Sequence, residues 1–495
     1  MYPVRFHRKG GFLVAKEEKE MEAKDKPFGF VDKLAYASGD FGCNMSFALK
    51  SYITIYWTQY MGIDSVLMSG LLIVVQIWDA IDDPLIGAII DADTHKYKRN
   101  KFLAYIWLGS IGLVIGGALC FMPFPNAPYM VKCILFVVGY MIWDAFYTVA
   151  NVPYGSMLSL ITDDPEERAQ LSSWRSVGST AGSIATGIIV PLIIYDASDN
   201  LRGGLMFWMA LIFGVVGFIC FQYTVHNTTI RVDTTVKTTE DKEDKPKFNW
   251  FRSVGNFLRS RPALGATLAP FGMFISYYGA STATTVMFQS YFNAASISGV
   301  LSMISYVGVF IYPFFIDKLV ARYGKKELCT IGSVIACIGY GLLIVLPISA
   351  DTTGLIMYTV CNIIAALGAG LINNLAWSLV ADATDYNEWK HGSREEGTMY
   401  SLHSFFRKVG QSIGPSLGLL LAAALGYDES LGSAQTAATA LNMRYLSATM
   451  YLLGGVIELI SYGLVYNLNK ATTDQMNEEL NERHAAQAAE AASNE

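Results

Sequence analysis

Long apolar runs separated by short polar stretches dominate this chain. Each run exceeds the roughly 20 residues that a helix needs to cross the hydrocarbon of a bilayer. The expected spans lie near 34–60, 64–92, 101–122, 128–154, 170–195, 203–225, 264–292, 296–320, 327–350, 354–383, 396–425 and 443–467. This pattern predicts an all-α polytopic membrane protein with twelve transmembrane helices.

The polar connections predict how the spans are grouped and oriented. Lys and Arg gather in the loops at 93–101 and 318–326, whereas the alternate connections near 61–64, 123–127, 293–296 and 349–353 have neither. The excess of positive charge marks the cytoplasmic side, so both termini are expected in the cytoplasm. Each basic loop follows the second span of its half, which is a weak internal repeat. We therefore expect two six-helix bundles with a site between them near the midplane.

The expected division of the chain follows from these signals. It consists of a charged N-terminal tail at 1–33, a first bundle at 34–225, a cytoplasmic linker at 226–263, a second bundle at 264–467 and a C-terminal tail at 468–495.

Composition changes this picture little. The 495 residues are 52% hydrophobic and 16% charged, against about 25% charged residues in soluble proteins. The seven cysteines have no paired or metal-binding spacing, and no nucleophile–base set or phosphate-binding glycine loop stands out. We expect a multi-pass protein of the cell membrane that is no enzyme, needs no cofactor and binds no nucleic acid.

Three carboxylates interrupt the second span. Asp79, Asp82 and Asp83 lie within an otherwise apolar stretch, where each ionised group costs about 2.5 kcal/mol or more. Asp79 and Asp83 share one helix face, and Pro84 is expected to loosen the backbone beside them. Acidic oxygens at such a point are suited to a small cation. Pairing with lysines or arginines of a neighbouring helix is the alternative.

Other spans also carry polar side chains. The first span has Asn44 and Lys50, the fifth has Arg175, the fourth has Asp144, Tyr147, Thr148 and Asn151, and the eleventh has His403, Arg407 and Lys408. Any one of them could join two helices through a hydrogen bond. As a set they favour a polar cavity within the membrane.

The chain resembles a known family in five motifs. These are Tyr36-xx-Gly39-Asp40-x-Gly42-x-Asn44, the stretch from Trp78 to Gly87 followed by Asp91, Tyr147-Thr148-xx-Asn151-x-Pro153-Tyr154, Ala381-Asp382-xx-Asp385-Tyr386-xx-Trp389 and Arg407-Lys408-x-Gly410. They are similar to motifs of the glycoside-pentoside-hexuronide:cation symporters, the melibiose permease-like branch of the major facilitator superfamily. The resemblance implies transport of a sugar or glycoside driven by Na+ or H+, across the lipid bilayer.

The resemblance also implies two sites. Asp79 and Asp83, with an oxygen from Thr148, would bind the coupling cation, and Asp82 would add a charge where the melibiose permease has asparagine. Asn44, Tyr147, Asn151, Arg175 and Lys408 would bind the sugar. No metal is implied beyond the coupling cation.

The charge of the substrate remains open at this point. Lys50, His403 and Arg407 add positive charge, while Asn44 and Asn151 replace aspartates of the melibiose permease. A hexuronide would benefit, because a charge-assisted bond to its carboxylate contributes roughly 1.5–3 kcal/mol. Alternatively, Lys50 and Arg407 only neutralise Asp82 and Asp144.

The cytoplasmic ends of the helices are expected to form a gate. Asp91 with Arg99, and Asp317 with Arg322, would make charge contacts that close the inner side. We expect a carrier that functions as a monomer. A carrier of a lipid or drug-like substrate in the same fold, and a sugar sensor that does not transport, are the rival functions.

Overall fold

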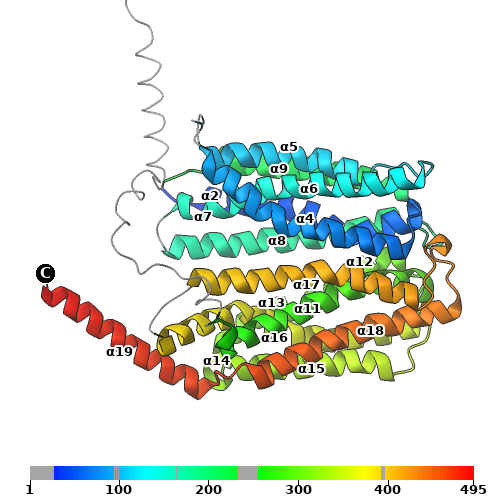
Figure 1. The fold of residues 1–495 in the computed structure, drawn as a ribbon. Helices are drawn as coiled ribbons and strands as arrows, with labels where there is room; N and C mark the ends of the chain where they lie inside the picture. Colours follow the sequence, from blue (N-terminus) through cyan, green and yellow to red (C-terminus); the bar gives the residue numbers. More distant parts are fainter. Residues whose placement is uncertain are drawn as a thin grey trace, which may run out of the picture.

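The computed structural model is a long bundle of helices that run roughly side by side (Figure 1). It describes residues 27–494, apart from 94, 96, 98–99, 163–164, 232–254, 256 and 392–395. Among these residues there is no strand, and a single bridge joins Tyr195 to Leu201.

The first half of the chain folds into one group of packed helices. These are α2 (Phe30–Ala48), η1 (Leu49–Tyr52), α3 (Ile53–Ile55), η2 (Tyr56–Tyr60), α4 (Ser65–Ala92), α5 (Lys101–Cys120), α6 (Tyr129–Ser156), α7 (Leu158–Ile161), α8 (Pro165–Ile194) and α9 (Gly203–Asn227). Helix α2 packs against α8 and α9, and α6 packs against α5 and α4. Aromatic side chains such as Trp57, Trp143 and Phe136 fill the core between them.

The second half forms a similar group beside the first. Its elements are α11 (Arg261–Val286), η3 (Met287–Tyr291), η4 (Ala295–Ile297), α12 (Ser298–Ser302), η5 (Met303–Tyr306), α13 (Val307–Ile311), η6 (Tyr312–Phe314), α14 (Ile316–Tyr323), α15 (Lys325–Val345), α16 (Thr352–His391), α17 (Glu396–Ala424), η7 (Glu429–Leu431), α18 (Ala437–Ile460), η8 (Ser461–Val465) and α19 (Lys470–Asn494). Helix α11 packs against α17 and α18, and α15 packs against α16.

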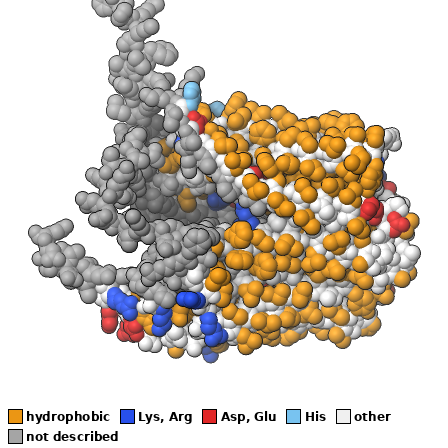
Figure 2. Space-filling model, in the orientation of Figure 1, with side chains coloured by type: hydrophobic (Ala, Val, Ile, Leu, Met, Phe, Trp, Pro, Cys, Tyr) orange, Lys and Arg blue, Asp and Glu red, His pale blue; other side chains and the backbone are white. Residues whose placement is uncertain are grey.

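Hydrophobic side chains cover the flank of the bundle, while charged side chains lie mostly toward its two ends (Figure 2). Within the described residues, 8 helical segments are long and apolar enough to cross a membrane. A soluble protein would not expose so continuous an apolar surface. The chain is therefore a multi-pass membrane protein.

Several helices differ from the expected spans. The first begins at Phe30, before residue 34, and α16 runs to His391, beyond residue 383. Helix α4 continues through Pro84 to Ala92, so the expected loosening is not seen as a break in the helix.

The segment expected as one span at 296–320 departs most. It is a series of short α- and 3-10 pieces rather than one helix. A Cβ on Gly299 would lie 1.7 Å from the Gly187 carbonyl oxygen, and one on Gly308 would lie 2.4 Å from that of Ala366. Close backbone contact with α8 and α16 accompanies the irregular path, and Pro313 cannot donate a backbone hydrogen bond.

The two groups meet through α4 with α17 and through α8 with α12. At the end where η2 and η3 terminate, Gln59 and Gln289 exchange hydrogen bonds of 2.9 and 3.1 Å between their amides. Gln59 also donates to the Tyr427 hydroxyl at 3.1 Å. We call Gln59, Gln289 and Tyr427 the glutamine latch. Nearby, Ser65 donates to the Glu429 carboxylate at 2.7 Å, which adds another contact between the halves.

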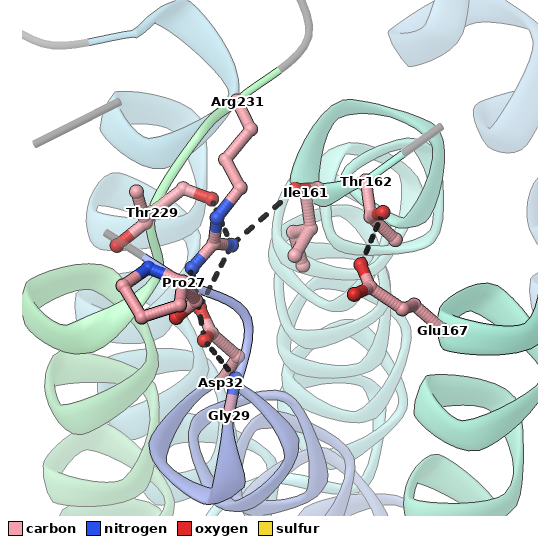
Figure 3. Close-up of polar contacts among 8 residues, drawn as sticks. All are labelled: Pro27, Gly29, Asp32, Ile161, Thr162, Glu167, Thr229 and Arg231. Atoms are coloured by element: carbon pink, nitrogen blue, oxygen red, sulfur yellow. Dashed lines mark hydrogen bonds and ion pairs between the residues drawn. The ribbon is translucent and has the colours of Figure 1, made fainter. Parts of the chain in front are cut away.

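Arg231 connects the segment after α9, the last helix of the first group, to the start of α2, its first helix (Figure 3). Arg231, which follows α9, donates to both carboxylate oxygens of Asp32 at 3.1 and 3.0 Å. It also donates to the Ile161 carbonyl at 3.4 Å. Asp32 in turn accepts from the Gly29 backbone N–H at the start of α2. These bonds fix the start of α2 against the segment that leaves α9.

The C-terminal helix α19 starts at the end of the bundle away from the glutamine latch and leads away from the bundle (Figure 1). The Trp389 indole N–H on α16 donates to the Glu479 carboxylate at 2.6 Å, and Arg483 donates to the Trp389 carbonyl at 3.2 Å. Met476 and Leu480 are buried on the same side of α19. One polar and one apolar stripe therefore dock this helix on α16.

Candidate functional site

Three carboxylates meet inside the first helix group. Asp79 and Asp82 on α4 and Asp144 on α6 each offer an oxygen, and these oxygens lie within 4.8 Å of one another. Thr148, one helical turn beyond Asp144, donates its hydroxyl to Asp82 Oδ2 at 3.0 Å. We call Asp79, Asp82, Asp144 and Thr148 the carboxylate cluster. It forms because α4 and α6 pack together and present their polar faces to each other.

The cluster has unused acceptors. Asp82 and Asp144 are both 0% exposed. Asp82 Oδ1 and Asp144 Oδ2 accept no hydrogen bond from any described residue. Buried carboxylate oxygens are costly unless a donor or a cation satisfies them. Hard oxygen ligands at this spacing are suited to a small cation such as Na+, and a proton could also satisfy them.

Lys50 partly balances the charge. Its ammonium lies 2.7 Å from Asp144 Oδ1, and the rings of Phe47, Tyr140, Trp143 and Tyr147 surround it at 5.0–5.9 Å. On the second half, the charges of Asp79 and Asp82 act on Lys408 of α17. A lysine from each half of the chain therefore lies within electrostatic reach of the cluster.

The predicted sugar-binding residues of the first half lie together around α2. Asn44 donates to the Asp40 carbonyl at 3.0 Å, and the Arg175 guanidinium lies 3.6 Å from the Asp40 carboxylate. Asn151 is 3.9 Å from the Cys43 thiol, and the Tyr147 ring packs against Phe47. The faces of α2, α6 and α8 thus bring Asn44, Tyr147, Asn151 and Arg175 into one polar region.

The second half contributes other cations. Arg407 stacks on Phe274 with its guanidinium carbon 5.6 Å from the ring centroid, and its buried Nε has no acceptor among the described residues. His403 is buried between Thr267 of α11, at 3.4 Å, and the Trp377 ring of α16. The structure thus places His403 within the second helix group, in contact with neither the carboxylate cluster nor the predicted sugar-binding residues of the first half.

Some predicted residues lie outside the described part. The side chain of Asp83, and those of Asp91, Arg99 and Asp317 in the predicted gate, are among them. The fourth predicted gate residue, Arg322, lies over the Tyr323 ring at 5.2 Å.

Asp144 is the member of the carboxylate cluster that the sequence-based prediction of the cation site did not include. It shares a helix face with Thr148, four residues on, and Thr148 was already a predicted ligand. This spacing was a usable signal. The contact between Lys50 and Asp144, 94 residues apart, carried no local signal.

Comparison with known proteins agrees with the fold. The fold is shared with a mutant of the nucleoside transporter NupG at a TM-score of 0.57 and 13% identity, covering 87% of this chain and 100% of that one. A bacterial homologue of the human lysosomal transporter Spinster gives a TM-score of 0.56 at 14% identity, covering 88% of this chain and 95% of that one. These two likenesses show that the chain shares the fold of these transporters.

Residues 35–470 match the family described as MFS/sugar transport protein. The chain belongs to this family, that of the glycoside-pentoside-hexuronide symporters. It is 29% identical to the "Uncharacterized symporter YjmB" of Bacillus subtilis, over 93% of this chain and 97% of that one. It is 29% identical to the isoprimeverose transporter of Lactiplantibacillus pentosus, over 84% of each chain. A glucuronide carrier protein homologue of Escherichia coli is 26% identical over 80% of this chain and 83% of that protein.

Proposed function

We propose that this sugar transporter is a cation-coupled symporter of a sugar or glycoside. The observation that carries the proposal is the buried carboxylate cluster, with two oxygens that accept no hydrogen bond from the described residues. Asp79, Asp82, Asp144 and Thr148 would bind the coupling ion, Na+ or H+. Asp83 stays a predicted ligand from its position in the sequence.

The coupling follows from linkage. An arriving cation removes the repulsion between the carboxylates and favours the arrangement of α4 and α6 that binds sugar. Sugar binding must then favour cation binding by the same factor. The predicted topology supports this proposal: twelve spans in two six-helix bundles, 34–225 and 264–467, with both termini in the cytoplasm. Rocking of the two bundles about the shared site would carry both solutes across the cell membrane.

The sugar would bind next to the carboxylate cluster. Asn44, Tyr147, Asn151 and Arg175 offer hydroxyl-binding groups on the first half, and Lys408 stays a predicted sugar ligand on the second. The predicted role of His403 as a sugar ligand has less support, because its contacts are internal to the second half. A hexuronide is favoured as substrate by the unpaired Nε of Arg407, and by the name of the glucuronide carrier homologue.

Uptake into vesicles tests the proposal. The purified monomer would be reconstituted, and uptake of labelled glucuronides and neutral glycosides measured with a Na+ gradient, with a proton gradient and with neither. We expect one gradient to drive accumulation, and Asp82→Asn to abolish accumulation while leaving sugar exchange intact. Thr54→Val, which alters a polar residue outside the cluster, serves as the matched control. Uptake that ignores both gradients would overturn the proposal.

A further inference from the structure

Lys50 lies on an irregular turn of the first span, in contact with the carboxylate cluster. The span changes from α2 to the 3-10 turn η1 at Leu49, so that Lys50 is held by a weaker hydrogen-bond pattern than a residue of a regular helix. A 3-10 turn within a longer helix often marks a hinge. The lysine side chain adds four flexible carbons to this mobility.

The ammonium of Lys50 competes for the position that a cation would take. It binds Asp144 Oδ1, while Asp144 Oδ2 and Asp82 Oδ1 remain available. A cation that binds these oxygens would lie a few ångströms from the ammonium. At such separations in a partly buried site, like charges repel strongly, because water screens them less than at the surface. The Lys50 ammonium and the bound cation therefore weaken each other's contact with Asp144.

The aromatic rings around Lys50 offer other contacts to the ammonium once it leaves Asp144. Phe47 and Tyr147 both contact the ammonium, with ring centroids 5.3 Å apart, and Tyr147 is itself a predicted sugar-binding residue. The ammonium is already 5.7 Å from the centroid of Tyr147. A sugar bound against Tyr147 would thus be within reach of the lysine without a change in the helix. Cation–π contact stabilises the charge along this path.

We propose that Lys50 couples the two sites: binding of the cation to Asp144 releases the Lys50 ammonium, which then binds an anionic group of the sugar. This inference rests on the proposed function, and it assigns the substrate to the anionic sugars. The same substrate would hold Lys50 away from Asp144 and so favour the cation.

The experiment compares two ligands that differ by one carboxylate. Affinities for para-nitrophenyl glucuronide and para-nitrophenyl glucoside are measured on the full-length purified protein, with and without saturating cation. If Na+ drives uptake by the wild type, affinities in Na+ are compared with affinities in choline. If protons drive it, affinities at acidic pH are compared with affinities at neutral pH. The measured quantity is a ratio. It is the fold-increase in affinity for the glucuronide on adding cation, divided by the fold-increase in affinity for the glucoside. We expect about a tenfold ratio in the wild type, typical of allosteric coupling.

The variants separate coupling from a structural role. Lys50→Met leaves Asp144 buried without its partner and can fail to fold. The principal variant is therefore Lys50→Gln, which keeps a hydrogen-bond donor for Asp144 and leaves every residue of the carboxylate cluster in place. We expect its ratio to fall to about one, with the protein still monodisperse and still binding the glucoside. Lys50→Arg keeps a cation on a similar stem and should keep most of the ratio.

Failure of this inference can be distinguished from failure of the proposed function. If the wild type accumulates no glycoside on either gradient, the proposed symport is wrong. If it does, but its ratio is one, or if Lys50→Gln keeps the wild-type ratio, the Lys50–Asp144 pair is structural and the coupling role of Lys50 is wrong.

Discussion

At the scale of single residues, Thr148 offers the sharpest test of the cation site. Its hydroxyl donates to Asp82 at 3.0 Å, and both side chains are buried. Thr148→Val keeps the shape but removes the donor. A hydrogen bond of this kind contributes about 0.5–1.5 kcal/mol, more when the acceptor is charged. We expect the cation concentration for half-maximal sugar uptake to rise about tenfold.

The matched control is Thr148→Ser, which keeps the hydroxyl and should keep the cation dependence of the wild type. An unchanged cation dependence in Thr148→Val would remove Thr148 from the site. Equal losses in both variants would indicate a packing defect instead.

The residues of this site were predictable to different degrees. Asp79, Asp82 and Thr148 stood out because a charge or a family motif within a span is visible in one sequence. The roles of Lys50 and Asp144 depend on a contact between α6 and the turn that follows α2, which local spacing cannot reveal. Of the two interpretations of Lys50 weighed from the sequence, the structure brings it to Asp144, in agreement with charge neutralisation in this state.

At the scale of elements, the positions of the helices were predictable and their irregularities were not. Each apolar run corresponds to helical structure, because length and hydropathy are local properties. The sequence pattern did not reveal the π-helical turns η2 and η3. Nor did it reveal the broken path at 295–314, where Gly299 and Gly308 approach other backbones closely. These approaches depend on how the helices pack in the whole bundle, which a local sequence pattern does not show.

The docking of α19 should depend on pH through Glu479. The hydrogen bond from the Trp389 indole, with a second one from Gln475, lowers the pKa of this carboxyl below its ordinary value of 4.5. A lowered pKa stabilises the docked state above the ordinary pKa, and this stabilisation is lost as the pH falls through the lowered value. We expect hydrogen exchange of amides in 470–480 to be unchanged near neutral pH and to accelerate, beyond its intrinsic pH dependence, below about pH 4.

Glu479→Gln distinguishes this effect from general acid unfolding. Glutamine still accepts from Trp389 but does not titrate, so the extra acceleration should disappear. If the variant accelerates as the wild type does, another group controls the docking of α19.

At the scale of the whole molecule, the glutamine latch should set which end is open. Gln59→Leu removes the bonds to both Gln289 and Tyr427, at about 0.5–1.5 kcal/mol each. We expect the population open at this end to rise about tenfold. Distances between spin labels on the two halves would report the change.

Gln222→Leu is the matched control, because Gln222 bonds Ser110 at 3.2 Å within the first half only. It should leave the two populations as they are. An equal shift in both variants, or none in Gln59→Leu, would show that the latch does not determine the state.

The latch also has a consequence for the surroundings in which the carrier works. Gln59, Gln289 and Tyr427 bond through amides and a hydroxyl, with no ion pair among them. Dissolved salt weakens attraction between exposed ions, over a Debye length of about 8 Å at physiological ionic strength. It has little effect on bonds between neutral groups. The population in which this end of the carrier is closed should therefore be the same at low and at high salt concentration.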